Sequence, residues 1–158
     1  PNPLTSQQII PRYLGNIAAL HGLTYEIPEH FWHQHPDPNE WSPLEIVVHL
    51  LESECQVQRP RLEVILAEEN PFLVNPPTPP APYRTDLNGV DGHSVVRQFA
   101  AERLKTISLL EGLKDDQWIR SARHSVFGPT NLLEMAAFTA RHDRLHINQL
   151  CQTLGKCL

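Results

Sequence analysis

Four long stretches of the chain carry apolar residues three and four positions apart, which is the spacing of an amphipathic α-helix. They cover roughly residues 5–21, 42–69, 94–113 and 130–153, and few other segments show the alternation typical of a β-strand. Helices of this length bury their apolar faces against one another. The pattern therefore predicts an all-α four-helix bundle, and we expect a single domain over residues 1–158.

Two long connections are predicted between these helices, so a simple up-down-up-down order is not required. The first contains six prolines between Pro71 and Pro82, which exclude a regular helix and favour extended backbone. Such a connection either shapes a binding site or simply crosses from one helix to the next. The second, residues 123–130, is also expected to be an irregular connector. The predicted fold is therefore a bundle with long crossover connections.

The second stretch has the clearest start signal in the sequence. Ser42 is a good N-cap, Pro43 suits the first helical position, and Glu45 completes a capping box three residues after the serine. A helix that begins here is expected to continue to about Glu69, with a bend at Pro60.

The other boundary signals are single residues. Pro11 is expected either in the first turn of the first helix or at a kink within it. Asp115 is the expected cap of one extra helical turn, and Thr130 is the expected cap of the last long helix. Gly155 is the predicted stop signal of that helix.

Charge and composition exclude some classes of partner. The formal net charge is −5 and the sequence pI is about 6.0, which argues against a general nucleic-acid or membrane-surface binder. No apolar run approaches the roughly 20 residues that span a membrane, and the first residues do not resemble a signal peptide. The three cysteines lack C-x-x-C spacing and suggest reduced thiols. We therefore expect a cytoplasmic protein.

The most distinctive chemistry lies in the last helix, where His142 and His146 form the sequence H-D-x-x-H. Residues four apart share one helix face, with Cβ atoms about 5–6 Å apart, so two imidazoles can hold one metal ion. Phe138 and Met135 precede His142 on the same stripe, which predicts that His142 faces the bundle interior. The alternative is a hydrogen-bonded or exposed pair that arose by chance among nine histidines.

This pair resembles the H-E-x-x-H motif of zinc proteases, but the other residues that such a protease site needs are not where the motif requires them. No His, Asp or Glu follows His146, so a third ligand of those types must come from upstream. Asp143 is shorter than glutamate and lies about 100° around the helix from His142. His49, near the start of the second helix, is the best upstream candidate. Its alternative role is a core-edge histidine bonded to a neighbouring acid such as Glu52.

The remaining histidines are predicted to lie outside this site. His30, His33 and His35 stand among prolines, which favours an exposed loop. His93 and His124 flank helices and are expected in caps or loops, although His124 is placed to approach the site from its connector.

Two segments, in this order, resemble the signatures of the DinB-like (YfiT-like) superfamily. "WSPLEIVVHLLESE" followed by "RPRLE" resembles the first signature, and "HSVFGPTNLLEMAAFTARHDRLHINQL" resembles the second. The segment "FAAERLKTISLLEGLKDDQW" is similar to the third helix of that family. The resemblance runs from about Trp41 to Leu150. It implies a four-helix bundle with a long crossover and a divalent metal site formed by His49, His142 and His146.

The resemblance also implies a class of activity. Three imidazoles leave coordination positions open, as in catalytic metal sites. Zn²⁺ is the first expectation, and Ni²⁺, Fe²⁺ and Mn²⁺ also accept imidazole. Members of the superfamily are linked to metal-dependent hydrolysis and to S-transfer or isomerisation with a low-molecular-weight thiol. We therefore expect a metal-dependent transferase or hydrolase that acts on a small-molecule substrate.

Two other classes of function stay open on the sequence alone. One is a stress-associated metal-binding protein without turnover, and the other is a dimeric helical module whose histidines are structural. A homodimer formed through helix faces is an expectation from the resemblance.

Several charged residues are further candidates near the expected site. Glu45, Glu52 and Asp143 are candidates to orient an imidazole through a ring N–H, and the alternative for each is a surface acid on a helix. For Asp143 the surface position is the favoured interpretation. The arginines are candidates to recognise an anionic substrate or are ordinary surface charges, and they are Arg59, Arg61 and Arg141.

Overall fold

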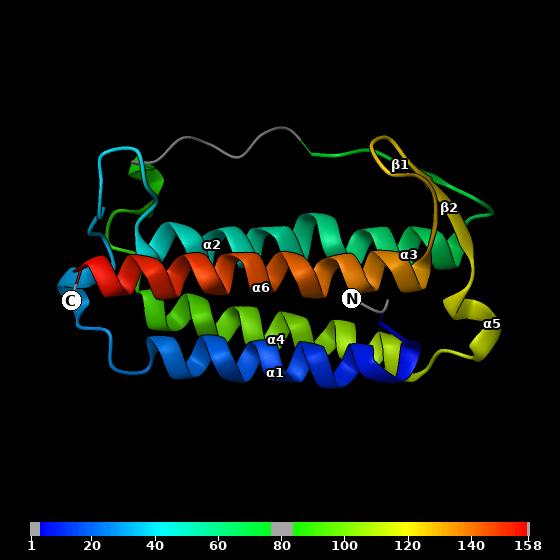
Figure 1. The fold of residues 1–158 in the computed structure, drawn as a ribbon, viewed down its shortest axis with the longest axis horizontal. Helices are drawn as coiled ribbons and strands as arrows, with labels where there is room; N and C mark the ends of the chain where they lie inside the picture. The colour runs from blue at the N-terminus through cyan, green and yellow to red at the C-terminus, as the bar shows by residue number, and fades with distance from the viewer. Residues whose placement is uncertain (1–3, 77–83, 158) are drawn as a thin grey trace.

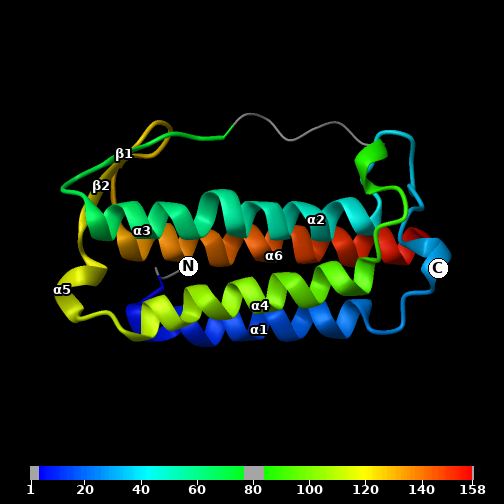
Figure 2. The ribbon, with the colours of Figure 1, turned by 180° about the vertical axis from the view of Figure 1, so that it is seen from behind.

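A computed structural model describes residues 4–76 and 84–157 of the chain. Its long helices lie side by side, and α1 and α2 each pack against both α4 and α6 (Figures 1 and 2). The helices of the bundle are α1 (Ser6–Thr24), α2 (Pro43–Ser53), α3 (Arg59–Ala67), α4 (Gly92–Glu111) and α6 (Leu132–Cys157). The predicted all-α four-helix bundle is confirmed.

The bundle contains a long crossover. The helices α2 and α4 begin at the same end of the bundle and run in the same direction, while α1 and α6 run in the opposite direction (Figure 1). The chain between α3 and α4 therefore returns along the length of the bundle. Residues 77–83, which contain much of the proline-rich stretch, lie outside the described residues.

The start of the second helix is formed as the sequence predicts. The Ser42 hydroxyl accepts a hydrogen bond from the Glu45 backbone N–H at 3.2 Å and donates one to Glu45 Oε1 at 3.1 Å. The predicted single helix is interrupted, however, by a π-helical turn at Glu54–Gln58, just before Pro60. Pro60 instead lies in the first turn of α3, where its missing N–H is tolerated.

In two helices, the residue at the N-cap position is not the one that the sequence predicted. The short helix α5 (Asp115–Trp118) contains Asp115 as its first residue, and Lys114 occupies the cap position. The last helix begins after Asn131, whose Oδ1 accepts a hydrogen bond from the Glu134 N–H at 2.9 Å. Asn131, rather than Thr130, is thus the residue that caps α6.

The helices α1 and α6 also continue further at their C-terminal ends than predicted. Pro11 lies inside α1, and the helix continues to Thr24. Gly155 does not stop α6, which continues to Cys157. The extra turn is held by the buried side chain of Leu154 and by an ion pair between Lys156 and Glu40.

A small sheet replaces the irregular connector that we expected before α6. It consists of β1 (Phe72–Leu73), β2 (Ser121–His124) and β3 (Gly128–Asn131), in the order β1-β2-β3. The strands β1 and β2 are parallel, while β2 and β3 form an antiparallel hairpin. Strands of two to four residues are too short to show a periodic pattern in the sequence. The hairpin places His124 against the bundle.

The core has an apolar cluster toward each end of the bundle and polar side chains between them. One cluster includes Leu20, Leu50, Phe99 and Leu150, and the other includes Tyr13, Leu62, Ile107 and Ala140. Along all four helices, the residues between these clusters carry buried polar side chains: Asn16, Glu54, Arg103, Thr106 and Asp143. We call these five side chains the buried polar layer.

Among the described residues, no helix combines the length and the apolar character that a membrane-spanning segment requires.

Candidate metal centre

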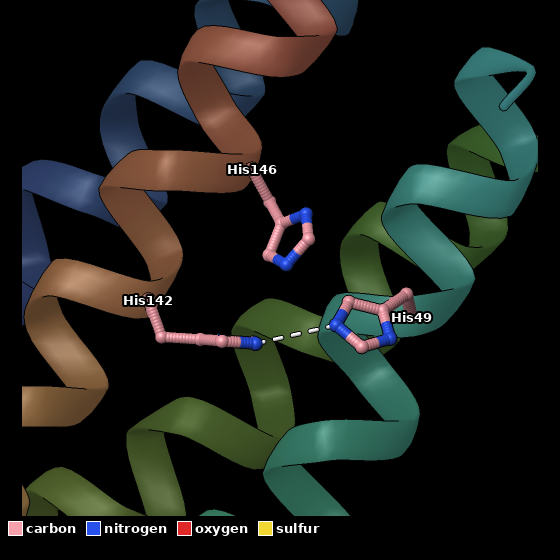
Figure 3. Close-up of side chains that lie close together, drawn as sticks. All are labelled: His49, His142 and His146. Carbon is pink, nitrogen blue, oxygen red and sulfur yellow. Dashed lines mark hydrogen bonds between the residues drawn. The ribbon is translucent and has the colours of Figure 1, made fainter. Parts of the chain in front are cut away.

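Three histidines from two helices converge on one point between α2 and α6. His49 projects from α2, and His142 and His146 project toward it from successive turns of α6 (Figure 3). One ligand nitrogen from each ring lies within 4.8 Å of the other two, and His49 Nε2 lies 3.2 Å from His142 Nε2. The structure thus brings together the three residues predicted to form a site.

The helices determine this convergence. His142 and His146 are four residues apart on α6, so their rings share a face, and their centroids are 4.6 Å apart. The His49 ring approaches that face from α2, with its centroid 4.4 Å from the His146 ring. Trp41, just before α2, stacks parallel to the His146 ring and meets the His49 ring edge-on. The indole therefore forms one wall of the cluster.

The surroundings keep the imidazoles uncharged. Burial, and then the neighbouring His146, lower the pKa of His49 to about 4. Burial also lowers the pKa of His142 to about 3, with smaller effects from the other two histidines and from Arg103 and Arg61. For His146, burial lowers the pKa although Gln149 and Asp143 oppose the shift. Neutral imidazoles present lone pairs, which is the form that binds a metal ion.

Hydrogen bonds at the cluster suit a metal-binding role. His146 Nδ1 lies 2.9 Å from Gln149 Oε1 and donates to it, which leaves the Nε2 lone pair of that ring available. His142 Nδ1 is buried and has no hydrogen-bond partner among the described residues. His142 Nε2, rather than Nδ1, faces His49, so an ion at the point of convergence would bind Nε2 and leave Nδ1 without a partner. The donor set of three neutral imidazoles fits Zn²⁺ and similar divalent ions.

The acids proposed to orient these rings are engaged elsewhere. Glu45 contacts His35, and Glu52 accepts two hydrogen bonds of 2.9 Å from Arg84. Asp143 is 1% exposed, so the surface position favoured from the sequence is wrong. Its carboxylate pairs with Arg103 of the buried polar layer. The hydrogen bonds found among the described residues join none of these three acids to the histidine cluster.

The buried polar layer was missed by the sequence analysis. Arg103 is 1% exposed and forms ion pairs with Asp143 and, at 2.8 Å, with Glu54. Asn16 also donates to Asp143 at 3.1 Å, so α1, α2–α3, α4 and α6 meet through these contacts. The available signal was an arginine four residues after Phe99, on the apolar face of the third helix. The layer fixes α6 beside the turn that carries His142.

Among the histidines predicted to lie outside the site, some are exposed and others are partly or fully buried. His30 and His33 are exposed as expected, although His30 lies in a short 3-10 helix, Glu29–Phe31, rather than in a loop. His35 is only partly exposed and contacts Glu45, so it is not a free loop residue. His93 lies inside the first turn of α4. His124 is buried at the end of β2, which the expected loop position did not anticipate.

The fold and the site define a class of protein: a four-helix bundle with a crossover and a histidine triad between its second and last helices. The chain belongs to the DinB superfamily, because the model of that family matches residues 13–150. The resemblance found in the sequence is thus confirmed. No curated protein gives a significant match to the chain.

A solved structure shares the fold over nearly the whole chain. It is YfiT from Bacillus subtilis, described as "a probable metal-dependent hydrolase with an unusual four-helix bundle topology". The match has a TM-score of 0.78 at 18% sequence identity and covers 97% of this chain and 90% of that chain. At this level of identity the match supports the fold.

The lowered pKa values predict how pH changes the stability of the metal-free protein. His49 and His142 titrate at about 4 and about 3 in the folded chain, against 6.5 for an ordinary histidine. Below pH 6.5 the unfolded chain binds more protons at these two histidines than the folded chain does. The free energy of unfolding therefore falls as the pH drops from 6.5 toward 3. Urea unfolding at several pH values measures this slope. We expect a shallower slope for His142→Ala and an unchanged slope for His33→Ala; equal slopes for all three proteins would contradict the assignment.

Proposed function

We propose that the chain is a divalent-metal-dependent enzyme whose metal ion is held by His49, His142 and His146. The observation that carries this proposal is the convergence of three neutral imidazoles at one point. Three histidine ligands leave coordination positions for water or substrate, whereas structural zinc sites are closed by four protein ligands. Zn²⁺ is the proposed metal, and Ni²⁺, Fe²⁺ and Mn²⁺ are the alternatives with suitable ligand preference.

The reaction we propose is hydrolysis or S-transfer on a small molecule. A divalent metal bound at this point supplies a Lewis acid that acidifies a coordinated water or thiol. Hydrolysis agrees with the description of YfiT, and S-transfer from a low-molecular-weight thiol is the second reaction implied by the superfamily. The cytoplasmic location and the homodimer remain predictions.

The chain itself contributes orientation and exclusion of water. Gln149 holds one ring of the cluster in a fixed tautomer, as its contact with His146 shows. Trp41 covers two of the rings with an apolar surface. The buried polar layer keeps α6 in place against the other helices. These features favour a preformed site, which is what catalysis by positioning requires.

A paired activity screen tests the proposal. Protein loaded with each of the four metals is assayed on ester and amide substrates, and separately on electrophiles with low-molecular-weight thiols. We expect turnover in one of the two panels, its loss in His142→Ala, and its retention in His33→Ala, which removes an exposed histidine. A metal-loaded protein that is silent in both panels would instead support metal binding without turnover.

A further inference from the structure

One arginine near the histidine cluster is buried without an acidic partner. Arg61, on α3, is 8% exposed. Its Nη2 donates weak hydrogen bonds to two neutral oxygens, Val74 O at 3.4 Å and Asn75 Oδ1 at 3.2 Å. No carboxylate pairs with it among the described residues, and the chain outside them carries no acidic side chain. The guanidinium therefore keeps unused N–H donors and an unbalanced positive charge.

Three other shielded arginines have carboxylate partners, whereas the less buried Arg120 donates to two backbone carbonyls. Arg59 pairs with Glu102, Arg84 pairs with Glu52, and Arg103 pairs with two buried carboxylates. Burial alone lowers the pKa of Arg61, with no acid to oppose it. An unpaired buried charge is expensive, so its retention suggests a partner that arrives with a ligand.

A second unused donor belongs to His124 at the end of β2. Its Nδ1 accepts hydrogen bonds from the backbone N–H of Val126 at 3.1 Å and of Phe127 at 3.4 Å. The proton of the neutral ring must therefore lie on Nε2. That Nε2–H is buried and has no acceptor among the described residues. Burial and the Arg61 charge lower the pKa of this ring, so it is a neutral donor at physiological pH.

His124 lies next to the cavity that Arg61 lines, because it pairs in the sheet with Leu73, which lines the same cavity. Contacts also lead from both residues toward the proposed metal centre. Thr139, one turn before His142 on α6, donates to Gln58 Oε1 at 2.9 Å and so joins α6 to the turn before Arg61. A continuous row of ring contacts leads from the hairpin to the cluster. It runs from His124 to Phe127 at 4.4 Å, from Phe127 to Phe138 at 5.2 Å, and from Phe138 to His142 at 6.3 Å between centroids.

The cavity at Arg61 can admit a small molecule. Its volume is about 330 Å³, and it lies between α3 and the chain around β1. Phe72 and Leu73 give it apolar surface, and Phe72 is 57% exposed.

We propose that Arg61 and His124 form a carboxylate-binding subsite beside the histidine cluster, and that the substrate of the enzyme is an organic acid. A planar guanidinium matches a carboxylate through two parallel hydrogen bonds, and a neutral imidazole N–H adds a third. One positive charge balances one carboxylate. The apolar side chains of the cavity, Phe72 among them, favour an apolar or aromatic group attached to it. The proposal rests on the proposed metal enzyme for its reaction, but the binding of the anion does not depend on a metal.

Benzoate is the probe, and it is titrated into the protein both as purified and after removal of metal by a chelator. The readouts are the ring resonances of His124 and the dissociation constant. We expect saturable binding in both forms, with the His124 Nε2–H signal shifting.

Arg61→Met is expected to weaken binding about tenfold or more. Arg61→Lys is expected to weaken it less, because lysine keeps the positive charge but lacks the two parallel N–H donors of the guanidinium. Arg59→Met is the matched control, since that arginine already has a carboxylate partner.

Several results would overturn the subsite. They are the absence of saturable benzoate binding, equal affinity in Arg61→Met and the native protein, or an equal loss in Arg59→Met. Tighter Arg61-dependent binding of inorganic phosphate would overturn the choice of a carboxylate. If Arg61→Met does not fold, Arg61→Lys and His124→Phe decide, and unchanged affinity in both would refute the proposal. Metal content, measured separately, shows whether the metal centre itself is correctly assigned.

Discussion

Replacing His142 with alanine is expected to reduce the affinity for Zn²⁺ by at least about 100-fold. Loss of a residue that only orients a metal ligand costs about 10–100-fold, and His142 is proposed as a ligand itself. Its Nε2 lies 3.2 Å from His49 Nε2 within the cluster. Competition with a chelator of known affinity measures the change. His49→Ala and His146→Ala are expected to give losses of similar size.

The matched control for these variants is His33→Ala, which removes an exposed histidine that lies outside the cluster. It should bind Zn²⁺ as tightly as the native protein. Far-UV circular dichroism checks that every variant is folded. If His142→Ala bound one equivalent of zinc with native affinity, the assignment of His142 as a ligand would be wrong.

The second large effect is expected at the buried polar layer. Arg103→Met leaves the carboxylates of Glu54 and Asp143 buried without their positive partner. Removing one member of a buried ion-paired group typically costs about 3–5 kcal/mol. We therefore expect the free energy of unfolding at neutral pH to fall by about this amount. Urea unfolding of metal-free protein measures it without a contribution from metal binding.

Arg59→Met is the control for that measurement. Arg59 forms a partly exposed pair with Glu102, which keeps Lys105 as a second partner. The loss there should not exceed about 1 kcal/mol. An Arg103→Met protein as stable as the native chain would show that the buried ion pairs contribute nothing net to the fold.

The bundle and the pair of His142 and His146 could be predicted from the sequence because both depend on helical spacing. The apolar stripes predicted four helices, and the four-residue spacing of His142 and His146 predicted a shared face. His49 was a candidate on the helix that begins at the Ser42 cap, and the resemblance to the DinB-like superfamily assigned it to the site. What these patterns share is that neighbouring residues on one helix determine them.

Features that depend on contacts between distant segments could not be predicted in this way. The pairing of Arg103 with Asp143 joins residues 40 positions apart, and nothing local distinguishes that aspartate from a surface acid. The burial of His124 depends on a hairpin whose strands have four residues each. The π-helical turn before Pro60 likewise leaves little trace in the periodicity of so short a segment.

The most direct test of the central claim is X-ray absorption at the zinc edge of the reconstituted protein, together with its metal content. We expect one zinc per chain, with three imidazole nitrogens at about 2.0–2.1 Å and a further light ligand. In His142→Ala the imidazole contribution should fall or the zinc should be lost. Sulfur ligation at about 2.3 Å, or a zinc environment unchanged in His142→Ala, would contradict a metal centre built from His49, His142 and His146.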